Sequence, residues 1–229
     1  MLVLIADLLP RDEVATLRTL LDGPGAAWVD GRATAGHQGA PLKHNRQLAE
    51  DSALAREAGE RVLARLERQS RFISAALPDR VYPPMFNRYA LGDGFGSHVD
   101  NAVRLVPGSR GRKLRTDLSA TLFLSEPEDY DGGELCIDEG DASQSVKLPA
   151  GSLVLYPSTH LHHVNPVTRG VRYACVFWVQ SMVRDAARRA ILLGLDEASQ
   201  LLAACNADAT ARAQLLNAYH NLLRMWCDV

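Results

Sequence analysis

Two short stretches of the chain hold residue types that bind metals. The first, residues 87–100, runs from a strand-like segment through a glycine-broken stretch to His98-Val99-Asp100. Residues i and i+2 of an extended segment point to the same side, so His98 and Asp100 can offer an imidazole nitrogen and a carboxylate to one point. The second stretch, residues 155–164, contains His160, His162 and His163. One histidine from it would complete two histidines and one carboxylate, the set typical of non-haem iron(II) centres.

The spacing alone leaves the third ligand open. His160 and His162 share one face of an extended segment, whereas His163 points the other way. Each could bind the metal, orient a ligand, or be an ordinary solvated side chain. His37 and His44 lie in a polar, Gly-rich segment that could line the mouth of a site, although an exposed loop is the simpler interpretation.

An arginine follows the histidine cluster. Arg172 shares strand parity with Ala174, Val176 and Trp178, so its guanidinium can point inward with them. An inward guanidinium needs an anion, and its planar fork suits a carboxylate. Arg169, in a Thr-Arg-Gly sequence, is predicted to lie exposed in a turn.

The neighbouring polar and glycine residues have simpler predicted roles. Gly92, Gly94 and Gly96 are not a phosphate loop, because no phosphate-binding helix follows with the required spacing. We expect them to let the loop close over a substrate. Residues 131–133, Asp-Gly-Gly, are predicted to form a turn.

Three regions must position these residues. Residues 1–79 are predicted to form a helical segment that packs on the core, with one helix between Pro10 and Gly23 and a longer one from about Asp51 through Leu66 towards Ile73. Residues 80–181 change to closely spaced short strands, beginning with a half-buried strand over residues 115–124, which indicates an antiparallel sandwich or barrel. Residues 182–229 return to helices that could pack on this β-core or on a neighbouring subunit.

Composition excludes several classes of protein. The 229 residues contain 25 basic and 27 acidic side chains, a formal charge of −2, which argues against a dedicated nucleic-acid binder or a polybasic membrane-surface protein. No apolar run approaches the length of a membrane span, and Asp7 interrupts the N-terminal apolar run. The four cysteines form no CxxC pair, so we expect reduced thiols in a cytoplasmic protein.

Taken together, these motifs resemble the Fe(II)/2-oxoglutarate dioxygenases of the prolyl 4-hydroxylase type, and specifically the bacterial PKHD-type hydroxylases. The similarity covers nearly the whole chain, and the matching segments are residues 28–32, 86–89, 98–100, 115–125, 130–135, 147–151, 166–172 and 219–224.

The resemblance implies a fold, a reaction and a set of site residues. The fold would be a double-stranded β-helix, or jelly roll: a mainly β core with flanking helices. His98, Asp100 and His162 would bind Fe(II), Arg172 would bind the distal carboxylate of 2-oxoglutarate, and Tyr89 would contact that cosubstrate. The enzyme would hydroxylate a C–H bond while 2-oxoglutarate is converted to succinate and CO2, with L-ascorbate as the reductant.

The substrate and an alternative function stay open at this point. A peptidyl residue and a siderophore-like small molecule are equally compatible with the sequence. The alternative is a non-catalytic, cupin-like metal-binding or iron-sensing module, in which His160 and His162 would both be ligands. That interpretation leaves Arg172 without a role.

Overall fold

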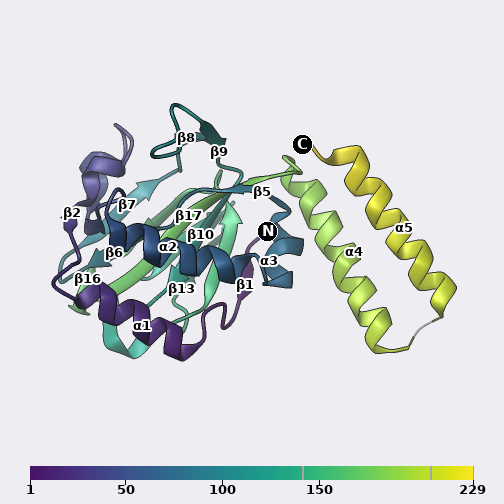
Figure 1. The fold of residues 1–229 in the computed structure, drawn as a ribbon, viewed down its shortest axis with the longest axis horizontal. Coiled ribbons are helices and arrows are strands. Elements are labelled where there is room, and N and C mark those ends of the chain that lie inside the picture. Colours follow the sequence, from purple (N-terminus) through teal and green to yellow (C-terminus); the bar gives the residue numbers. More distant parts are fainter. Residues whose placement is uncertain (141, 207, 229) are drawn as a thin grey trace.

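The computed structural model describes residues 1–140, 142–206 and 208–228, and its core is a sandwich of two antiparallel sheets (Figure 1). The major sheet has the strand order β1-β14-β10-β17-β6-β4-β2, and β5 pairs with β17. These strands are β1 (Val3–Ile5), β2 (Trp28–Asp30), β4 (Arg46–Leu48), β5 (Pro78–Val81), β6 (Met85–Tyr89), β10 (Leu118–Phe123), β14 (Leu153–Pro157) and β17 (Arg172–Ser181).

The minor sheet has the order β13-β12-β15-β7-β3. Its strands are β3 (Lys43–His44), β7 (Gly94–His98), β12 (Leu135–Glu139), β13 (Ala142–Val146) and β15 (His162–Val164). Two further strand pairs flank the sheets: β8 (Val103–Leu105) with β9 (Lys113–Arg115), and β11 (Tyr130–Gly132) with β16 (Val167–Gly170). The mainly β core with flanking helices that the sequence predicts is confirmed.

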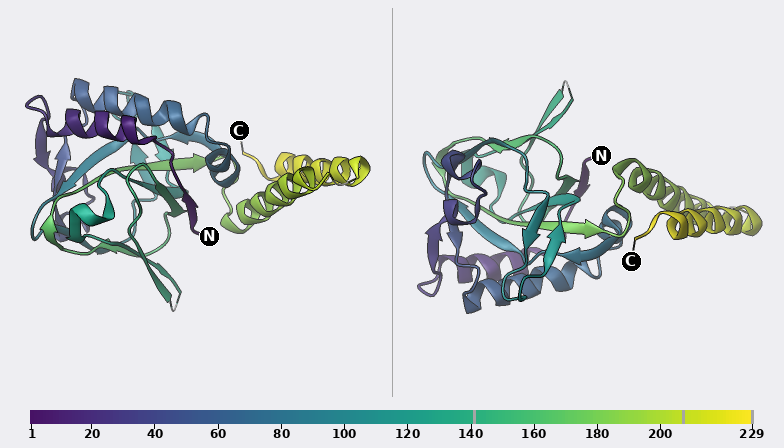
Figure 2. Two further views of the ribbon diagram at one scale, coloured as in Figure 1. Left: turned by 90° about the horizontal axis from the view of Figure 1, so that it is seen from below. Right: turned by 90° about the horizontal axis from the view of Figure 1, so that it is seen from above.

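Apolar side chains from both sheets form one of the buried clusters, and it lies between the sheets. Phe123 and Tyr156 contribute from the major sheet, and Leu135 and Ile137 from the minor one. A larger cluster joins the other face of the major sheet to three helices: α1 (Arg11–Asp22), α2 (Ala53–Leu66) and α3 (Ser70–Ala76). Figure 2 shows α1 and α2 side by side over that face. The site described below therefore has a rigid support on both sides.

The N-terminal region is less helical than predicted. Residues 1–79 contain β1 to β4, which extend both sheets, and three short 3-10 helices occur along the chain at Gly31–Thr34, Ala40–Leu42 and Pro127–Asp129. Strands of two or three residues are too short for a periodic pattern to show in the sequence. The long helix predicted from Asp51 is also interrupted: α2 ends at Leu66, and Ile73, on α3, is exposed.

Two predicted β features differ from the structure. Residues 115–124 form the end of β9 and then β10, whose six residues are all buried because the strand lies centrally between α-helices and the minor sheet. The predicted Asp131-Gly132-Gly133 turn is mostly strand β11. Gly132 has φ +68°, and an added Cβ would lie 2.1 Å from the Pro166 carbonyl oxygen, so close backbone packing requires glycine there.

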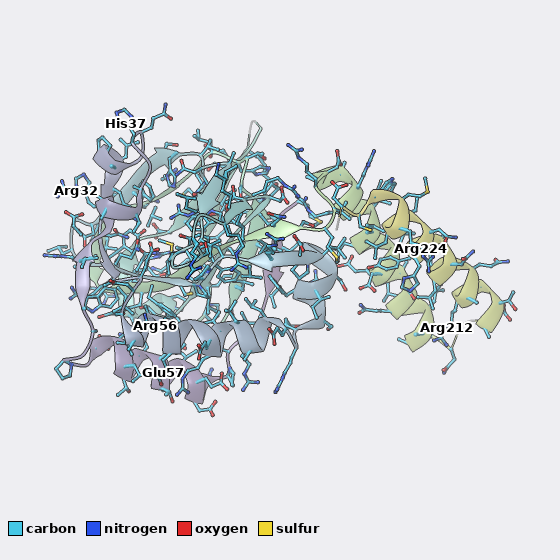
Figure 3. All side chains as sticks on the ribbon, turned by 45° about the horizontal axis from the view of Figure 1, so that its top comes forward. Arg32, His37, Arg56, Glu57, Arg212 and Arg224 are labelled. Carbon is cyan, nitrogen blue, oxygen red and sulfur yellow. The ribbon has the colours of Figure 1, made fainter. Side chains whose placement is uncertain are left out.

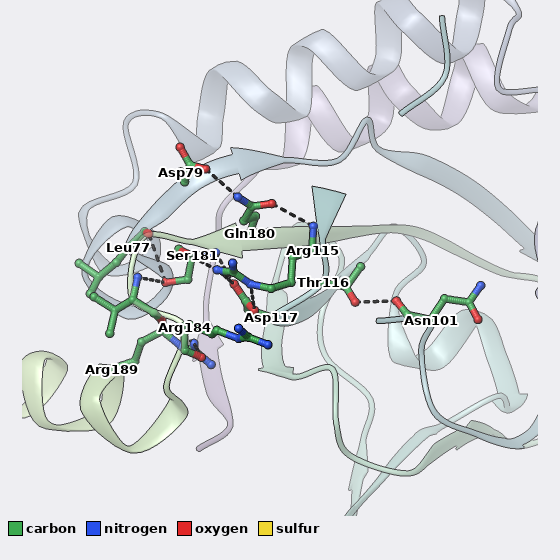
Figure 4. Close-up of polar contacts among 11 residues, drawn as sticks. Leu77, Asp79, Asn101, Arg115, Thr116, Asp117, Gln180, Ser181, Arg184 and Arg189 are labelled. Carbon is green, nitrogen blue, oxygen red and sulfur yellow. Dashed lines mark hydrogen bonds and ion pairs between the residues drawn. The ribbon is translucent and has the colours of Figure 1, made fainter. Parts of the chain in front are cut away.

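The C-terminal helices α4 (Ala186–Ala204) and α5 (Ala209–Trp226) form a hairpin that extends away from the sandwich (Figures 1 and 2). Arg189 is buried at its base and donates hydrogen bonds to the carbonyl oxygens of Val183 (2.7 Å) and Arg184 (2.8 Å). Close by, Asp117 accepts from Arg115 and from the Ser181 backbone (Figure 4). This polar cluster fixes the base of the hairpin to the end of β17.

Within the part of the chain that the structure describes, no helix is both long and apolar enough to cross a membrane.

Candidate metal centre and cavity

Three side chains converge where the minor sheet meets the loop after β7. His98 ends β7, His162 begins β15, and these residues face each other across the antiparallel pair. Asp100 follows His98 by two residues. Its Oδ1 lies 3.9 Å from His98 Nε2, and its Oδ2 lies 3.7 Å from His162 Nε2. One ligand atom from each residue lies within 4.8 Å of the others, so the three could hold one metal ion.

Backbone hydrogen bonds orient both imidazoles. His98 Nδ1 lies 2.8 Å from the Gly96 carbonyl oxygen, and His162 Nδ1 lies 3.0 Å from that of His160. A carbonyl can only accept, so each Nδ1 carries the proton and each Nε2 keeps its lone pair. Both lone pairs are directed to the side where Asp100 lies. This arrangement is usual for histidines that bind metals.

Aromatic side chains pack against both imidazoles, and burial lowers the pKa of one of them. The His98 ring stacks on Phe95 with 3.6 Å between centroids, and the His162 ring meets Tyr156 edge-on. Burial, together with the nearby His162, lowers the pKa of His98 to about 4. At neutral pH His98 is therefore unprotonated and able to donate its lone pair to a cation.

The carboxylate of Asp100 is also positioned by neighbours. Ser119, on β10, donates a hydrogen bond of 2.5 Å to Asp100 Oδ2 and lies 2.7 Å from the Ser158 hydroxyl. Both serines are buried. They connect the loop that carries Asp100 to the central strand of the major sheet, so the carboxylate is held between two rigid elements.

Arg172 opens β17 and is only 2% exposed. Its guanidinium carbon lies 5.1 Å from the centroid of the Tyr89 ring and 5.4 Å from that of Phe123. Its Nε is buried without a hydrogen-bond partner among the described residues. The Tyr89 ring is itself buried, which raises the pKa of its hydroxyl. A buried cation without a partner requires an anion, and a ligand carboxylate would supply one.

A cavity of about 300 Å³ joins these groups. It is lined by His98, Asp100, His162, Arg172 and Tyr89, among others, and Val176 and Trp178 line it from the same face of β17 as Arg172. Arg172 therefore points inward on the same face of the strand as Val176 and Trp178, as predicted. The volume is at the lower end of the range for pockets that hold small molecules.

The other histidines lie apart from this convergence. His160 Nδ1 is 4.0 Å from Glu139 Oε1, and His163 pairs with Cys136 in the minor sheet. His37 and His44 are exposed, and Figure 3 shows His37 at the edge of the molecule. None of the four lines the cavity. The metal-sensor alternative needs both His160 and His162 as ligands, but His160 is not part of the cluster that contains His162.

Arg169 is exposed, as predicted, but it lies in strand β16 and not in a turn. Its guanidinium forms an ion pair with Asp131 on the paired strand β11, with 2.7 Å between Nε and Oδ2. Of Arg169 and Arg172, only Arg172 lines the cavity.

The predicted flexible role of the glycines is also wrong for two of them. Gly94 and Gly96 lie in β7, where an added Cβ would approach the Val164 carbonyl oxygen to 3.0 Å and Leu42 to 3.2 Å. Their small size lets β15 and the 3-10 helix Ala40–Leu42 approach the strand that carries His98.

Comparisons with known proteins agree with this geometry. Residues 84–180 match the 2OG-Fe(II) oxygenase superfamily, and residues 185–228 match the PKHD-type hydroxylase C-terminal domain. A PKHD-type hydroxylase of Paraburkholderia phymatum is 58% identical over 228 residues, which covers 100% of both chains.

The chain belongs to the PKHD-type hydroxylases. This PKHD-type hydroxylase is thus an Fe(II)- and 2-oxoglutarate-dependent enzyme. A second relative, from Xanthomonas axonopodis pv. citri, is 56% identical over 230 residues and again covers 100% of both chains.

Solved structures confirm the jelly-roll fold of this PKHD-type hydroxylase. A prolyl-4-hydroxylase of Pseudomonas putida aligns with a TM-score of 0.51 and 21% identity, covering 79% of this chain and 92% of that one. A viral collagen prolyl hydroxylase of Paramecium Bursaria Chlorella virus-1 aligns with a TM-score of 0.51 and 16% identity, covering 79% and 96%. At these identities the similarity concerns the fold alone.

Several cavity residues were not singled out from the sequence. Ser119 and Phe95, which position the proposed ligands, lie in ordinary strand patterns. Lys43 and Arg104 also line the cavity, from β3 and β8. Lys43 follows Leu42 and precedes His44 and Asn45, and this local sequence does not distinguish a buried lysine from a solvated one.

Proposed function

We propose that this hydroxylase inserts an oxygen atom into a C–H bond of its substrate while 2-oxoglutarate is converted to succinate and CO2. The observation that carries the proposal is a single cavity with two complementary parts. His98, Asp100 and His162 supply three donors for Fe(II), and Arg172 supplies an unpartnered buried cation. Two histidines and one carboxylate leave positions on the metal open for other ligands.

The donor set fits Fe(II) because each imidazole has its Nδ1 directed to a backbone carbonyl and its Nε2 directed towards Asp100, whose carboxylate oxygens lie within 4 Å of both Nε2 atoms. Bound there, the iron would supply the oxygen chemistry that no protein side chain can provide. The chain's own residues hold the reactants. Ser119 orients Asp100, and the backbone carbonyls of Gly96 and His160 orient the two imidazoles.

Arg172 would fix the cosubstrate. Its guanidinium can form a bidentate pair with the distal carboxylate of 2-oxoglutarate, and the Tyr89 and Phe123 rings exclude water from that pair. Because the arginine begins the strand that pairs with β6 and β10, its position is set by the centre of the major sheet. We expect Tyr89 to contact the cosubstrate from the opposite register position.

Two further parts of the proposal rest on family resemblance and composition. L-Ascorbate is proposed as the reductant that keeps the iron ferrous. The cytoplasm is proposed as the compartment, supported by four free cysteines. A peptidyl residue and a small molecule both stay open as substrates.

The test is turnover of 2-oxoglutarate by purified protein, with and without Fe(II) and ascorbate, followed as succinate formation. We expect Fe(II)-dependent succinate in the wild type and none in Asp100→Ala. A weak metal-to-ligand charge-transfer band should appear when Fe(II) and 2-oxoglutarate are added anaerobically. Metal binding without this band and without succinate would favour the non-catalytic iron sensor instead.

A further inference from the structure

The end of the cavity beyond the proposed metal ligands carries two cations. Lys43 and Arg104 both line it, and among the described residues of its lining Asp100 is the only acidic one. In the proposed function Asp100 is engaged with the metal. The rest of the lining therefore has an excess of positive charge that the proposed reaction does not use.

Lys43 has only neutral hydrogen-bond partners. It is 6% exposed, and its Nζ lies 3.2 Å from both Thr34 Oγ1 and Gln47 Oε1. Burial, and then the charge of Arg104, lower the pKa of Lys43 to about 8. At neutral pH the side chain still carries its charge, close enough to Arg104 for the two to repel.

Arg104 is held by aromatic faces and not by an acid. Its guanidinium carbon lies 4.1 Å from the Trp178 ring centroid and 4.9 Å from that of Tyr82, and Nη2 lies 3.9 Å from Met85 Sδ. Its Nε is buried and has no hydrogen-bond partner in the described ranges. Within the described parts of the chain, no carboxylate lies within 4.0 Å of a nitrogen of either cation.

Two partly desolvated cations in one cavity, with no carboxylate at ion-pair distance among the described residues, are costly to fold. An anionic ligand at this end would offset the cost, and both side chains already present donors to the cavity. A substrate could reach these two cations from outside the protein. Arg104, Asn101 and Thr34 also line a wider, more open groove of about 800 Å³ that adjoins the cavity and would give access to it.

We propose that Lys43 and Arg104 form a subsite for an oxyanion of the substrate, a carboxylate in the first instance. The carboxylate lies against the guanidinium and ammonium groups, and the adjoining carbon skeleton lies on the Trp178 side of the cavity. The C–H bond to be hydroxylated then points towards the three proposed metal ligands. This inference rests on the proposed function and names the chemical class of its substrate: an organic anion, as opposed to a neutral peptide segment.

The test compares benzoate with benzamide, a neutral compound of nearly the same shape. The protein is loaded with Zn(II), which binds without turnover, and with saturating 2-oxoglutarate, so that Arg172 is already occupied. Binding of each probe is followed by saturation-transfer NMR. We expect benzoate to bind and benzamide to bind at least about tenfold more weakly, because a hydrogen bond to a charged group is stronger than one between neutral groups.

Variants assign the effect to the two cations. Arg104→Gln and Lys43→Met should each weaken benzoate binding about tenfold, without changing affinity for benzamide or 2-oxoglutarate. Arg169→Gln is the matched control, because Arg169 is exposed on β16 and pairs with Asp131. Circular dichroism and thermal unfolding show whether each variant folds. If one of the two cation variants does not fold, the other still tests the inference.

Four results would overturn the inference, and the first three concern the probes. They are no benzoate binding, equal binding of benzoate and benzamide by the wild type, and unchanged benzoate binding in both cation variants. Loss of 2-oxoglutarate affinity in the Arg104 variant would also overturn it, by placing these cations in the cosubstrate site. Failure of the wild type to bind 2-oxoglutarate would instead contradict the proposed function, so the two failures are distinguishable.

Discussion

At the scale of single residues, the proposed ligands depend on neighbours that do not touch the metal. Asp100 has one such neighbour in Ser119, which binds the carboxylate oxygen nearer to His162. Removing that hydroxyl should leave all three ligands in place but free the carboxylate to rotate. The proposed iron ligands are therefore distinct from the residues that position them.

The first prediction compares these two groups. Asp100→Ala should abolish Fe(II)-dependent succinate formation, whereas Ser119→Ala should weaken Fe(II) affinity by roughly 10–100-fold and retain turnover at high iron. Iron titration and succinate assays measure both effects. Thr19→Ala, on the exposed side of α1, is the control. Wild-type iron affinity in Asp100→Ala would exclude this carboxylate as a ligand.

The second prediction concerns the histidine cluster. His162→Ala should lose Fe(II), because its Nε2 is one of the three converging donors. His160→Ala and His163→Ala should retain iron, since neither side chain lines the cavity. The His160 backbone carbonyl that orients His162 survives the substitution. Equilibrium dialysis with Fe(II) distinguishes the three, and iron loss in His163→Ala alone would show that the strand register is wrong.

The third prediction concerns the two arginines. Arg172→Ala removes the pair with the 2-oxoglutarate carboxylate. This should reduce the binding free energy by about 1.5–3 kcal/mol, so the affinity for 2-oxoglutarate should fall by roughly 10- to 100-fold. Arg172→Lys should fall between wild type and Arg172→Ala, because it keeps the charge but not the fork. Arg169→Ala should bind 2-oxoglutarate with the affinity of the wild type. The measurement is the 2-oxoglutarate dependence of succinate formation, together with iron content, which should not change.

At the scale of elements, β7 connects the packing of the minor sheet to the site. Gly94 lies under the Val164 carbonyl and Gly96 under Leu42, so the strand approaches its neighbours more closely than a residue with a Cβ would allow. His98 ends this strand and Phe95 within it stacks on the imidazole. A shift of β7 would therefore move a proposed iron ligand.

The fourth prediction tests this coupling. In Gly94→Ala the new Cβ would lie 3.0 Å from the Val164 carbonyl oxygen, which should destabilise the fold by about 1–3 kcal/mol and lower iron affinity. Gly25→Ala is the control, because no atom lies within 4 Å of its added Cβ. Thermal unfolding and iron titration give the two readouts. A Gly94 variant as stable as Gly25→Ala would contradict the packing argument.

At the scale of the whole molecule, the α4–α5 hairpin has more apolar surface than the sandwich covers. No residue of α5 is buried, and Ile191, Leu201, Leu216 and Met225 are exposed. On α4, Ile191, Gly194, Ala198 and Leu201 follow a helical spacing that places four uncharged residues on one face. An apolar helix face is normally buried against a second element of secondary structure.

The fifth prediction is that a second copy of the chain covers this face. Helices of 18 and 19 residues are about 27 Å long, so two hairpins can contact each other along several helical turns, and a stable interface needs roughly 1,000 Å² in total. Light scattering should show a homo-oligomer. Ile191→Glu combined with Leu201→Glu should give monomers that still turn over 2-oxoglutarate, and Gln214→Glu is the control. A monomeric wild type would exclude this interface.

The sequence by itself determined the features that depend on neighbours along the chain. The i, i+2 spacing put His98 and Asp100 on one side, strand parity aimed Arg172 inward, and Pro10 and Gly23 marked the ends of α1. Each follows from the fixed geometry of a short extended or helical segment. Resemblance to a family then added His162 and the jelly roll.

Only the tertiary structure decided which residues from distant segments meet. The register of β15 against β7 placed His162 opposite His98 and left His160 and His163 aside. Pairing of β3 with β7, and the stacking of Arg104 on Trp178, brought two cations to one cavity. Inter-strand hydrogen bonds and aromatic contacts join segments far apart in sequence, and no local pattern encodes their register.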